Sequence, residues 1–216
     1  LTDIDCDRLV EEKKRGMTIE LGFAPFTLPS GQTISIVDVP GHEKFIRQMV
    51  AGAAGVDAVM LVIAADDGVM PQTREHLAIL SLLGIKNGLT VINKIDLVDE
   101  EMLEMAVDDA KSLLAGTFLS DKPVIPVSAF TGKGIEELKR ALQQMTEKAG
   151  AKSRKGAFFL PVDRAFHISG FGTVVTGTAI NGEIHEGDEV EVMPRGILSK
   201  VRSIQVHGAS VSTATA

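Results

Sequence analysis

The sequence contains no tryptophan and no tyrosine, and it has a single cysteine, Cys6, among 216 residues. One cysteine excludes an internal disulfide framework. No apolar run approaches the roughly 18 residues that a membrane-spanning helix needs, and nothing resembles a secretion signal. These absences predict a cytoplasmic protein without a membrane segment.

The sequence also lacks an excess of positive charge. Lysine and arginine together number 22 against 29 acidic residues, which gives a net charge of −7. A field of this sign does not attract nucleic acid, so any binding of RNA would need local basic patches. The length suits one large or two modest domains, and a hydrophobic content of 44% is ordinary for a globular protein.

A phosphate-binding loop of the form G-x-x-x-x-G-K-[ST] is missing as well. The nearest match, Thr131-Gly132-Lys133-Gly134, has neither the first glycine at the required spacing nor the final hydroxyl. The sequence begins at Leu1 in the middle of a polar, helix-like pattern, and residues 208–216 end without a structural terminator. We therefore expect a fragment that is truncated at both ends.

What is present begins with the pattern of an α/β domain. Residues 18–27 and 33–38 are rich in β-branched and apolar side chains around Pro29-Ser30-Gly31, which predicts a β-hairpin. Three later apolar runs alternate with helical stretches and so indicate a parallel sheet: residues 58–65, 89–92 and 124–127. The helical stretches include residues 71–83 and a closing helix that carries Ile135, Leu138, Leu142 and Met145 on one face.

After residue 150 the pattern changes to short strands. Residues 149–156 are basic and poor in apolar side chains, which is typical of a linker. Four strands are expected in the remainder, with Asn181-Gly182 as a type I′ hairpin turn: residues 158–162, 172–178, 189–193 and 200–206. The sequence therefore predicts two domains, residues 1–150 and residues 157–216, of which the second is an incomplete antiparallel β-barrel.

Asn93-Lys94-Ile95-Asp96 closes the apolar run at residues 89–92, where parallel sheets bind ligands. The Asp96 carboxylate can accept from the ring N–H and the exocyclic amine of guanine, whereas adenine offers an acceptor in place of the ring donor. A site built on this pair leaves polar groups unpaired with the wrong base, at about 1 to 3 kcal/mol for each group. The tetrapeptide predicts guanine selectivity, although alone it equally fits a capped loop between a strand and a helix.

Asp38-Val39-Pro40-Gly41-His42 follows the strand predicted at residues 33–38. In nucleoside triphosphatases an aspartate here holds Mg²⁺ through water, and the glycine amide donates to the γ-phosphate. His42 can orient the attacking water, and the competing interpretation is a surface histidine that opens a helix at Glu43. The hydroxyl of Thr18, 20 residues before Asp38, can coordinate the same Mg²⁺ if its loop closes over the phosphates.

Ser128-Ala129 ends the run at residues 124–127, where a backbone amide could meet the guanine oxygen. In order along the chain, Thr18, Asp38 with Gly41, Asn93 to Asp96, and Ser128-Ala129 resemble the motifs of translational GTPases of the elongation-factor type. Pro71-Gln72-Thr73-Arg74-Glu75-His76 matches a characteristic helix start of that family. The resemblance implies a phosphate-loop GTPase fold with helices on both faces of the sheet, whose first strand and phosphate loop would precede Leu1.

A finer resemblance, to the selenocysteine-specific branch of these factors, covers nearly the whole chain. It rests on residues 4–24, including Leu21-Gly22-Phe23-Ala24, and on Ala65-Asp66-Asp67-Gly68. In the second domain, residues 162–166 and 169–177 resemble the barrel that receives the aminoacyl end of tRNA. Arg164, beside Asp163, suits an ionised selenolate, although an ion pair between the two residues fits equally well.

The resemblance implies a monomeric GTPase that uses GTP and Mg²⁺ to deliver selenocysteyl-tRNA to the ribosome. Without a phosphate loop, these 216 residues alone are expected to bind GTP poorly and to be inactive. Three alternatives remain open from the sequence: a general aminoacyl-tRNA elongation factor, the GTPase subunit of sulfate adenylyltransferase, and a binding module that has lost GTPase activity.

Overall fold

The structure, a computed structural model, describes residues 1–216 except residue 3, residues 7–8, residue 54 and residues 150–155. The chain divides into two compact units, Leu1–Gly150 and Ala151–Ala216. Most of the linker predicted at residues 149–156 lies outside the described residues. Within the described part, no helix is long and apolar enough to cross a membrane.

A three-stranded parallel sheet forms the centre of the first unit. Strand β4 (Gly88–Asn93) pairs with β3 (Val59–Ala64) on one side and with β5 (Val124–Pro126) on the other. From Gly88 to Ile92 every residue of β4 is buried, as expected for a central strand that is covered on both faces. The prediction of an α/β fold with a parallel sheet is confirmed.

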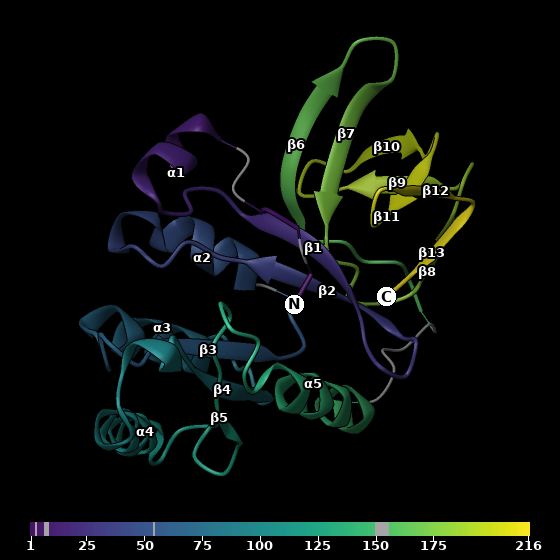
Figure 1. The fold of residues 1–216 in the computed structure, drawn as a ribbon. Coiled ribbons are helices and arrows are strands. Elements are labelled where there is room, and N and C mark those ends of the chain that lie inside the picture. Colours follow the sequence, from purple (N-terminus) through teal and green to yellow (C-terminus); the bar gives the residue numbers. More distant parts are fainter. Residues whose placement is uncertain (3, 7–8, 54, 150–155) are drawn as a thin grey trace. The chain divides into compact units, whose positions relative to one another are not determined.

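Helices cover both faces of this sheet (Figure 1). Helices α3 (Pro71–Leu82) and α4 (Glu100–Leu114) share a core with Ile92 of β4, whereas α5 (Ile135–Ala149) shares a second core with Val91. Neighbouring residues of β4 serve opposite cores because side chains alternate across a strand. The expected apolar face of the closing helix is confirmed, since Leu138 and Leu142 pack in the second core.

The predicted hairpin is confirmed as β1 (Gly22–Thr27) and β2 (Thr33–Asp38), which pair antiparallel. Its first strand begins at Gly22 and not at Thr18. Helix α1 (Val10–Arg15) ends at Gly16, and the carboxylate of Glu12 accepts the backbone N–H groups of the residues that follow Thr18. The backbone donors of Ile19 and Glu20 are therefore satisfied by a side chain and not by a strand partner.

A short helical segment follows β2. It consists of the 3₁₀-helix η1 (Glu43–Phe45) and helix α2 (Ile46–Ala53). Gly52 lets two neighbouring segments approach α2 closely, because a Cβ built there would lie 2.5 Å from Cδ2 of Leu21 and 2.9 Å from Cγ1 of Val39. Helix α2 is thus packed against both the segment before β1 and the segment after β2.

The second unit consists of antiparallel strand pairs, as expected for the incomplete antiparallel β-barrel that the sequence predicts. Strands β6 (Val162–Ile168) and β7 (Gly172–Gly177) form a hairpin, drawn in green in Figure 1. Strand β8 (Glu183–His185) pairs with β13 (Thr213–Thr215). Strand β9 (Glu189–Val192) pairs with β10 (Ile197–Lys200), and β11 (Ile204–Val206) pairs with β12 (Ala209–Val211).

Several strand predictions in this unit are wrong. Asn181-Gly182 is not a hairpin turn: Asn181 forms a bridge with Phe159, and β8, which follows it, pairs with β13. The local turn preference of Asn-Gly is overridden because the Asn181 carbonyl and the Asn181 side-chain amide are bonded to residues 157–159. The strand expected at residues 158–162 is only that bridge, and the strand expected at residues 200–206 is divided between β10 and β11.

The loop after β5 yields a prediction about stability. Gly134 has φ +79°, and a Cβ there would collide with the carbonyl oxygen of Pro126, whereas Gly132 has φ +81° and open space. Gly134→Ala should lower the free energy of unfolding by about 2 to 4 kcal/mol, from the left-handed backbone together with the collision. Gly132→Ala should cost only about 1 to 2 kcal/mol, from the backbone alone. Urea denaturation of both variants tests this, and equal losses would show that the collision is relieved at no cost.

Candidate functional site

The ends of β4 and β5 are joined by hydrogen bonds at one edge of the parallel sheet. The Ala129 backbone N–H donates to Oδ1 of Asn93 at 3.0 Å, and the Ile95 N–H donates to the carbonyl of Val127 at 3.3 Å. The structure therefore brings together two of the segments that the sequence predicts for a base-binding site.

Asp96 lies in the 3₁₀-helix η2 (Ile95–Leu97), directly after β4. The chain turns there because Lys94 adopts φ +61°, and the buried side chain of Ile95 anchors the turn in the core. The Asp96 side chain is exposed. Its carboxylate is therefore presented to solvent directly after a residue that is anchored in the core.

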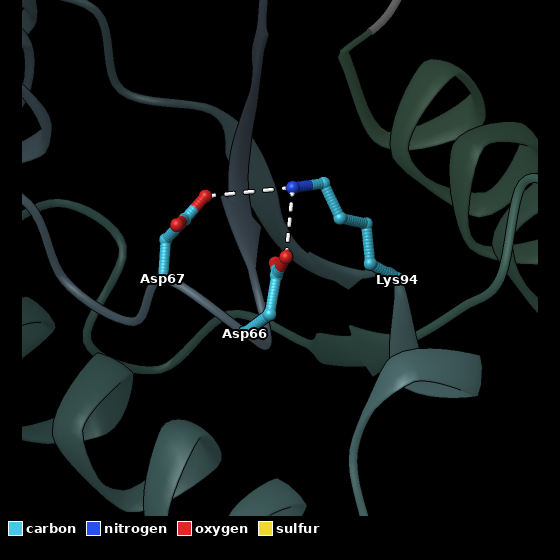
Figure 2. Close-up of polar contacts among 3 residues, drawn as sticks. All are labelled: Asp66, Asp67 and Lys94. Atoms are coloured by element: carbon cyan, nitrogen blue, oxygen red, sulfur yellow. Dashed lines mark hydrogen bonds and ion pairs between the residues drawn. The ribbon is translucent and has the colours of Figure 1, made fainter.

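Lys94 extends toward the end of the neighbouring strand. Its Nζ lies 3.0 Å from Oδ2 of Asp66 and 3.4 Å from Oδ2 of Asp67, as Figure 2 shows. The hydrogen bond to Asp66 raises the pKa of Lys94 above its ordinary value, so the ammonium form is favoured. No role for this acidic pair follows from the sequence, although the pair comes shortly after β3, at the edge of the sheet where β4 also ends.

Ser128 and Ala129, predicted as a pair, have different surroundings. The Ser128 side chain is fully buried, its Oγ accepts the Thr131 N–H at 2.9 Å, and its own N–H donates to the carbonyl of Lys133. Ala129 is exposed. Ser128 therefore holds the shape of the loop, and Ala129 is the member of the pair that a ligand can reach.

The residues expected at the phosphate end come from both sides of the β1–β2 hairpin. Asp38 is the last residue of β2 and pairs with Gly22, the first residue of β1. This register places the segment that leaves Thr18 beside the Asp38 end of the ladder. Both Thr18 and Asp38 are half-buried.

His42 caps η1 in this structure. Its Nδ1 accepts the Lys44 backbone N–H at 3.3 Å, and its ring lies 6.2 Å from that of Phe45, centroid to centroid. The competing interpretation from the sequence, a histidine that opens a helix, therefore describes this conformation. A role toward water would use Nε2, or a rotated side chain that gives up the cap.

His76 of α3 lies beside the Gly41 loop. A Cβ built on Gly41 would lie 4.0 Å from Cε1 of His76, an ordinary van der Waals distance, so the His76 ring and the Gly41 backbone are neighbours. Burial lowers the pKa of His76 below its ordinary value, and the Glu75 carboxylate partly offsets that effect. The sequence analysis noted His76 only as part of a motif, because nothing local in the sequence shows what α3 packs against.

The second unit holds Asp163 and Arg164 at a β-bulge. Val162 pairs with Gly177 and Arg164 with Thr176, so Asp163 is the extra residue of the strand. Oδ1 of Asp163 accepts the Thr176 hydroxyl at 2.5 Å across the hairpin. Bulges commonly redirect side chains at functional positions, and this one determines the direction in which Arg164 leaves the strand.

Two hollows lie away from the base-binding candidates. One, with a volume of about 600 Å³, is open to solvent and lies between η1, α2 and α3. Its lining residues are Glu43, Lys44, Ile46, Glu75, Ala78 and Ile79. We base the candidate site on the strand ends, because there the polar groups of several elements converge.

A comparison with protein families matches residues 2–148 to the elongation factor Tu GTP-binding domain. This range covers the whole first unit except its ends. The chain belongs to the elongation factor Tu GTP-binding domain family. The exposed Asp96 and the fixed Asn93–Ala129 pair are therefore found in a GTP-binding domain.

Individual relatives extend the similarity into the second unit. The selenocysteine-specific elongation factor of Desulfomicrobium baculatum is 53% identical over all 216 residues, and that of Escherichia coli is 41% identical over the same length. They cover 100% of this chain, which spans only 34% and 35% of those proteins.

Two solved structures resemble this GTP-binding domain and the unit that follows it. A bacterial selenocysteine-specific elongation factor superposes with a TM-score of 0.93 at 41% identity, over 100% of this chain and 37% of that one. The elongation factor SelB of Methanococcus maripaludis, in complex with the GTP analogue GppNHp, gives 0.84 at 39% identity, over 92% of this chain and 44% of that one.

The geometry of the base-binding loops predicts the effect of replacing Asp96. In the full-length protein, Asp96→Asn should reduce the preference for guanine over adenine nucleotides about 10- to 100-fold, because an amide cannot accept from both guanine donors. Competition between GDP and ADP for a fluorescent nucleotide measures this preference. Asp99→Asn is the matched control: Asp99 caps α4 through the Met102 N–H, a role that asparagine also fills. Unchanged selectivity in Asp96→Asn would remove Asp96 from base recognition.

Proposed function

We propose that this chain forms part of a translation elongation factor that uses GTP to deliver selenocysteyl-tRNA to the ribosome in the cytoplasm. The supporting observation is the 53% identity to a selenocysteine-specific factor over the whole chain, including the unit beyond the GTP-binding domain. An elongation factor 1-alpha, from Methanobrevibacter smithii, is 37% identical over 96% of the chain. A general aminoacyl-tRNA factor is therefore the second candidate.

We assign the base to the joined loops at the sheet edge. Asn93 and Asp96 bind the edge of guanine, and the Ala129 amide is directed to its oxygen. The Ala129 N–H donates to Oδ1 of Asn93, so Asn93 fastens the loop that carries this amide to the end of β4. Lys94 supports the same loop through its ion pairs with Asp66 and Asp67, and Ser128 maintains the loop from within the core.

At the other end, the Gly41 amide donates to the γ-phosphate, and Thr18 and Asp38 hold Mg²⁺. Mg²⁺ prefers oxygen ligands and is commonly held by one or two protein groups together with phosphate and water. A hydroxyl and a carboxylate fit that preference, and among the described residues no cluster of three His, Cys, Asp or Glu side chains could bind a metal by itself. When bound, the ion would neutralise charge that develops on the phosphates.

His42 orients the water that attacks the γ-phosphate, without a covalent intermediate. In the described conformation its Nδ1 caps η1. We propose that contact with the ribosome brings the imidazole to the water, which makes hydrolysis slow beforehand and lets GTP act as a timing switch.

The proposed role of His42 predicts separate effects on hydrolysis and on binding. In the full-length protein, His42→Ala should lower ribosome-stimulated GTP hydrolysis about 100-fold or more while leaving GTP affinity unchanged. Single-turnover hydrolysis with and without ribosomes measures this. Lys44→Ala is the control. It alters an exposed side chain of η1 but retains the Lys44 backbone N–H, which donates to Nδ1 of His42. An undiminished rate in His42→Ala would exclude His42 from the reaction.

The 216 residues include no phosphate loop, and we propose that by themselves they bind GTP weakly and do not hydrolyse it. Such a loop normally supplies a cradle of backbone amides and a lysine to the phosphates. The base-binding loops remain in the chain, so selectivity for guanine is expected to survive at low affinity.

Discrimination between aminoacyl-tRNAs tests the function itself. The full-length protein with GTP, as a monomer, should bind selenocysteyl-tRNA more tightly than seryl-tRNA on the same tRNA. Arg164→Ala should reduce this preference about 10- to 100-fold, since it removes a charge-assisted contact to the selenolate. Arg195→Ala, which removes an exposed arginine from the same unit, should leave it unchanged. Equal binding of elongator aminoacyl-tRNAs would instead support a general factor.

A further inference from the structure

Glu12 is a charged residue in an unusual place. It lies in the short, otherwise exposed helix α1, yet it is only 2% exposed. Its Oε2 accepts the Leu9 N–H at 2.7 Å, and its Oε1 accepts the N–H groups of Ile19 and Glu20, each at 3.0 Å. A buried carboxylate needs such partners, and amide bonds to a charged acceptor are about twice as strong as neutral ones.

The backbone of Glu12 contributes to the same region. Its carbonyl accepts the N–H groups of Gly16 at 2.8 Å and Met17 at 3.3 Å, at the left-handed end of α1. Thr18 therefore lies between Met17, bonded to the carbonyl of Glu12, and Ile19, bonded to its carboxylate. A single residue holds the chain immediately before and immediately after this threonine.

We propose that Glu12 is the positioning residue for Thr18: its buried carboxylate fastens the 17–20 loop to α1 and so sets the place of the Thr18 hydroxyl. The inference rests on the proposed function, in which Thr18 holds Mg²⁺. The neighbouring Glu11 does nothing comparable, because its side chain is 59% exposed and pairs with Arg15 on the helix surface.

The loop that the Glu12 carboxylate holds, residues 17–20, is also connected to the segment that carries His42. Leu21, the residue after the clamped pair, packs into the space left by Gly52 of α2, and Val39 of the Asp38–His42 segment packs there too. Glu12 thus fixes the Thr18 loop at one end, and the α2 contact fixes it at the other. Together these contacts place Thr18 with respect to the residues that follow β2.

Glu12→Gln tests the hydrogen bonds of the Glu12 carboxylate with little change in the shape of the side chain. A glutamine has one acceptor oxygen, which can accept either the Leu9 N–H or the N–H groups of Ile19 and Glu20. Its NH₂ group, itself a donor, then lies against the remaining backbone donor or donors and cannot accept from them. In the ligand-free protein, hydrogen exchange at the amides of Ile19, Glu20 or Leu9 should become about tenfold faster or more. Exchange in β4 should not change. Glu11→Gln removes the same charge from the same helix and should leave all of these amides as they are.

The functional measurement separates positioning from general stability. In the full-length protein, Glu12→Gln should raise the Mg²⁺ concentration for half-maximal GTP hydrolysis about tenfold and lower the maximal rate, with the GDP-over-ADP preference unchanged. The guanine contacts lie in other loops, so a loss of folding would instead reduce both properties. Glu12→Ala, which removes the carboxylate acceptor from three backbone amides, should show a larger effect in the same direction.

Two outcomes would overturn the inference. If the amides of Leu9, Ile19 and Glu20 all exchange at the wild-type rate in Glu12→Gln, the carboxylate does not hold the loop. If they exchange faster but the Mg²⁺ dependence stays the same, the loop does not position Thr18 for the reaction. Failure of the proposed function is recognised separately, because the unaltered full-length protein would then show neither guanine preference nor GTP hydrolysis.

Discussion

The parallel pairing of β4 with β3 and β5 determines where the residues proposed to bind the base lie. Parallel strands end at the same edge of a sheet, so residues that are distant in sequence meet there without any long connection. The Asp66–Lys94 ion pair and the Asn93–Ala129 hydrogen bond both cross from one strand end to the next. If β4 were shifted by one residue, the Asn93 side chain would point to the other face of the sheet and the buried side chains of β4 would face the wrong cores.

Several loops of the first unit satisfy their backbone donors in the same way. Each leaves a regular element with backbone N–H groups unsatisfied, and in each a side chain accepts them: Asn93 for Ala129, Ser128 for Thr131, His42 for Lys44, and Glu12 for three amides of its own segment. Side-chain acceptors hold a loop in one conformation while leaving its surface open to a ligand. The same residues that shape the loops are therefore near, or among, those proposed to bind nucleotide.

Much of the first unit could be predicted because its patterns are local. The buried run of β4, the Pro71 start of α3 and the apolar face of α5 each reflect a single element packed on the core. The second unit was harder to predict because its short strands bury little on either face and have weak alternation. There the Asn181-Gly182 signal was misleading, since the backbone around Asn181 pairs with Phe159 and not across a turn.

By itself, the sequence determined the residue types and their order: a carboxylate at the end of β2, an Asn-Lys-x-Asp run that begins at the end of β4, a Ser-Ala pair after β5, and no phosphate loop. Residue type and spacing carry that information, because they follow from what guanine and phosphate require. Only the tertiary structure decided what each group contacts, since Lys94 with Asp66, His76 with Gly41, and Glu12 on both sides of Thr18 are brought together by packing. Such contacts depend on how whole elements pack against one another, which no local pattern encodes.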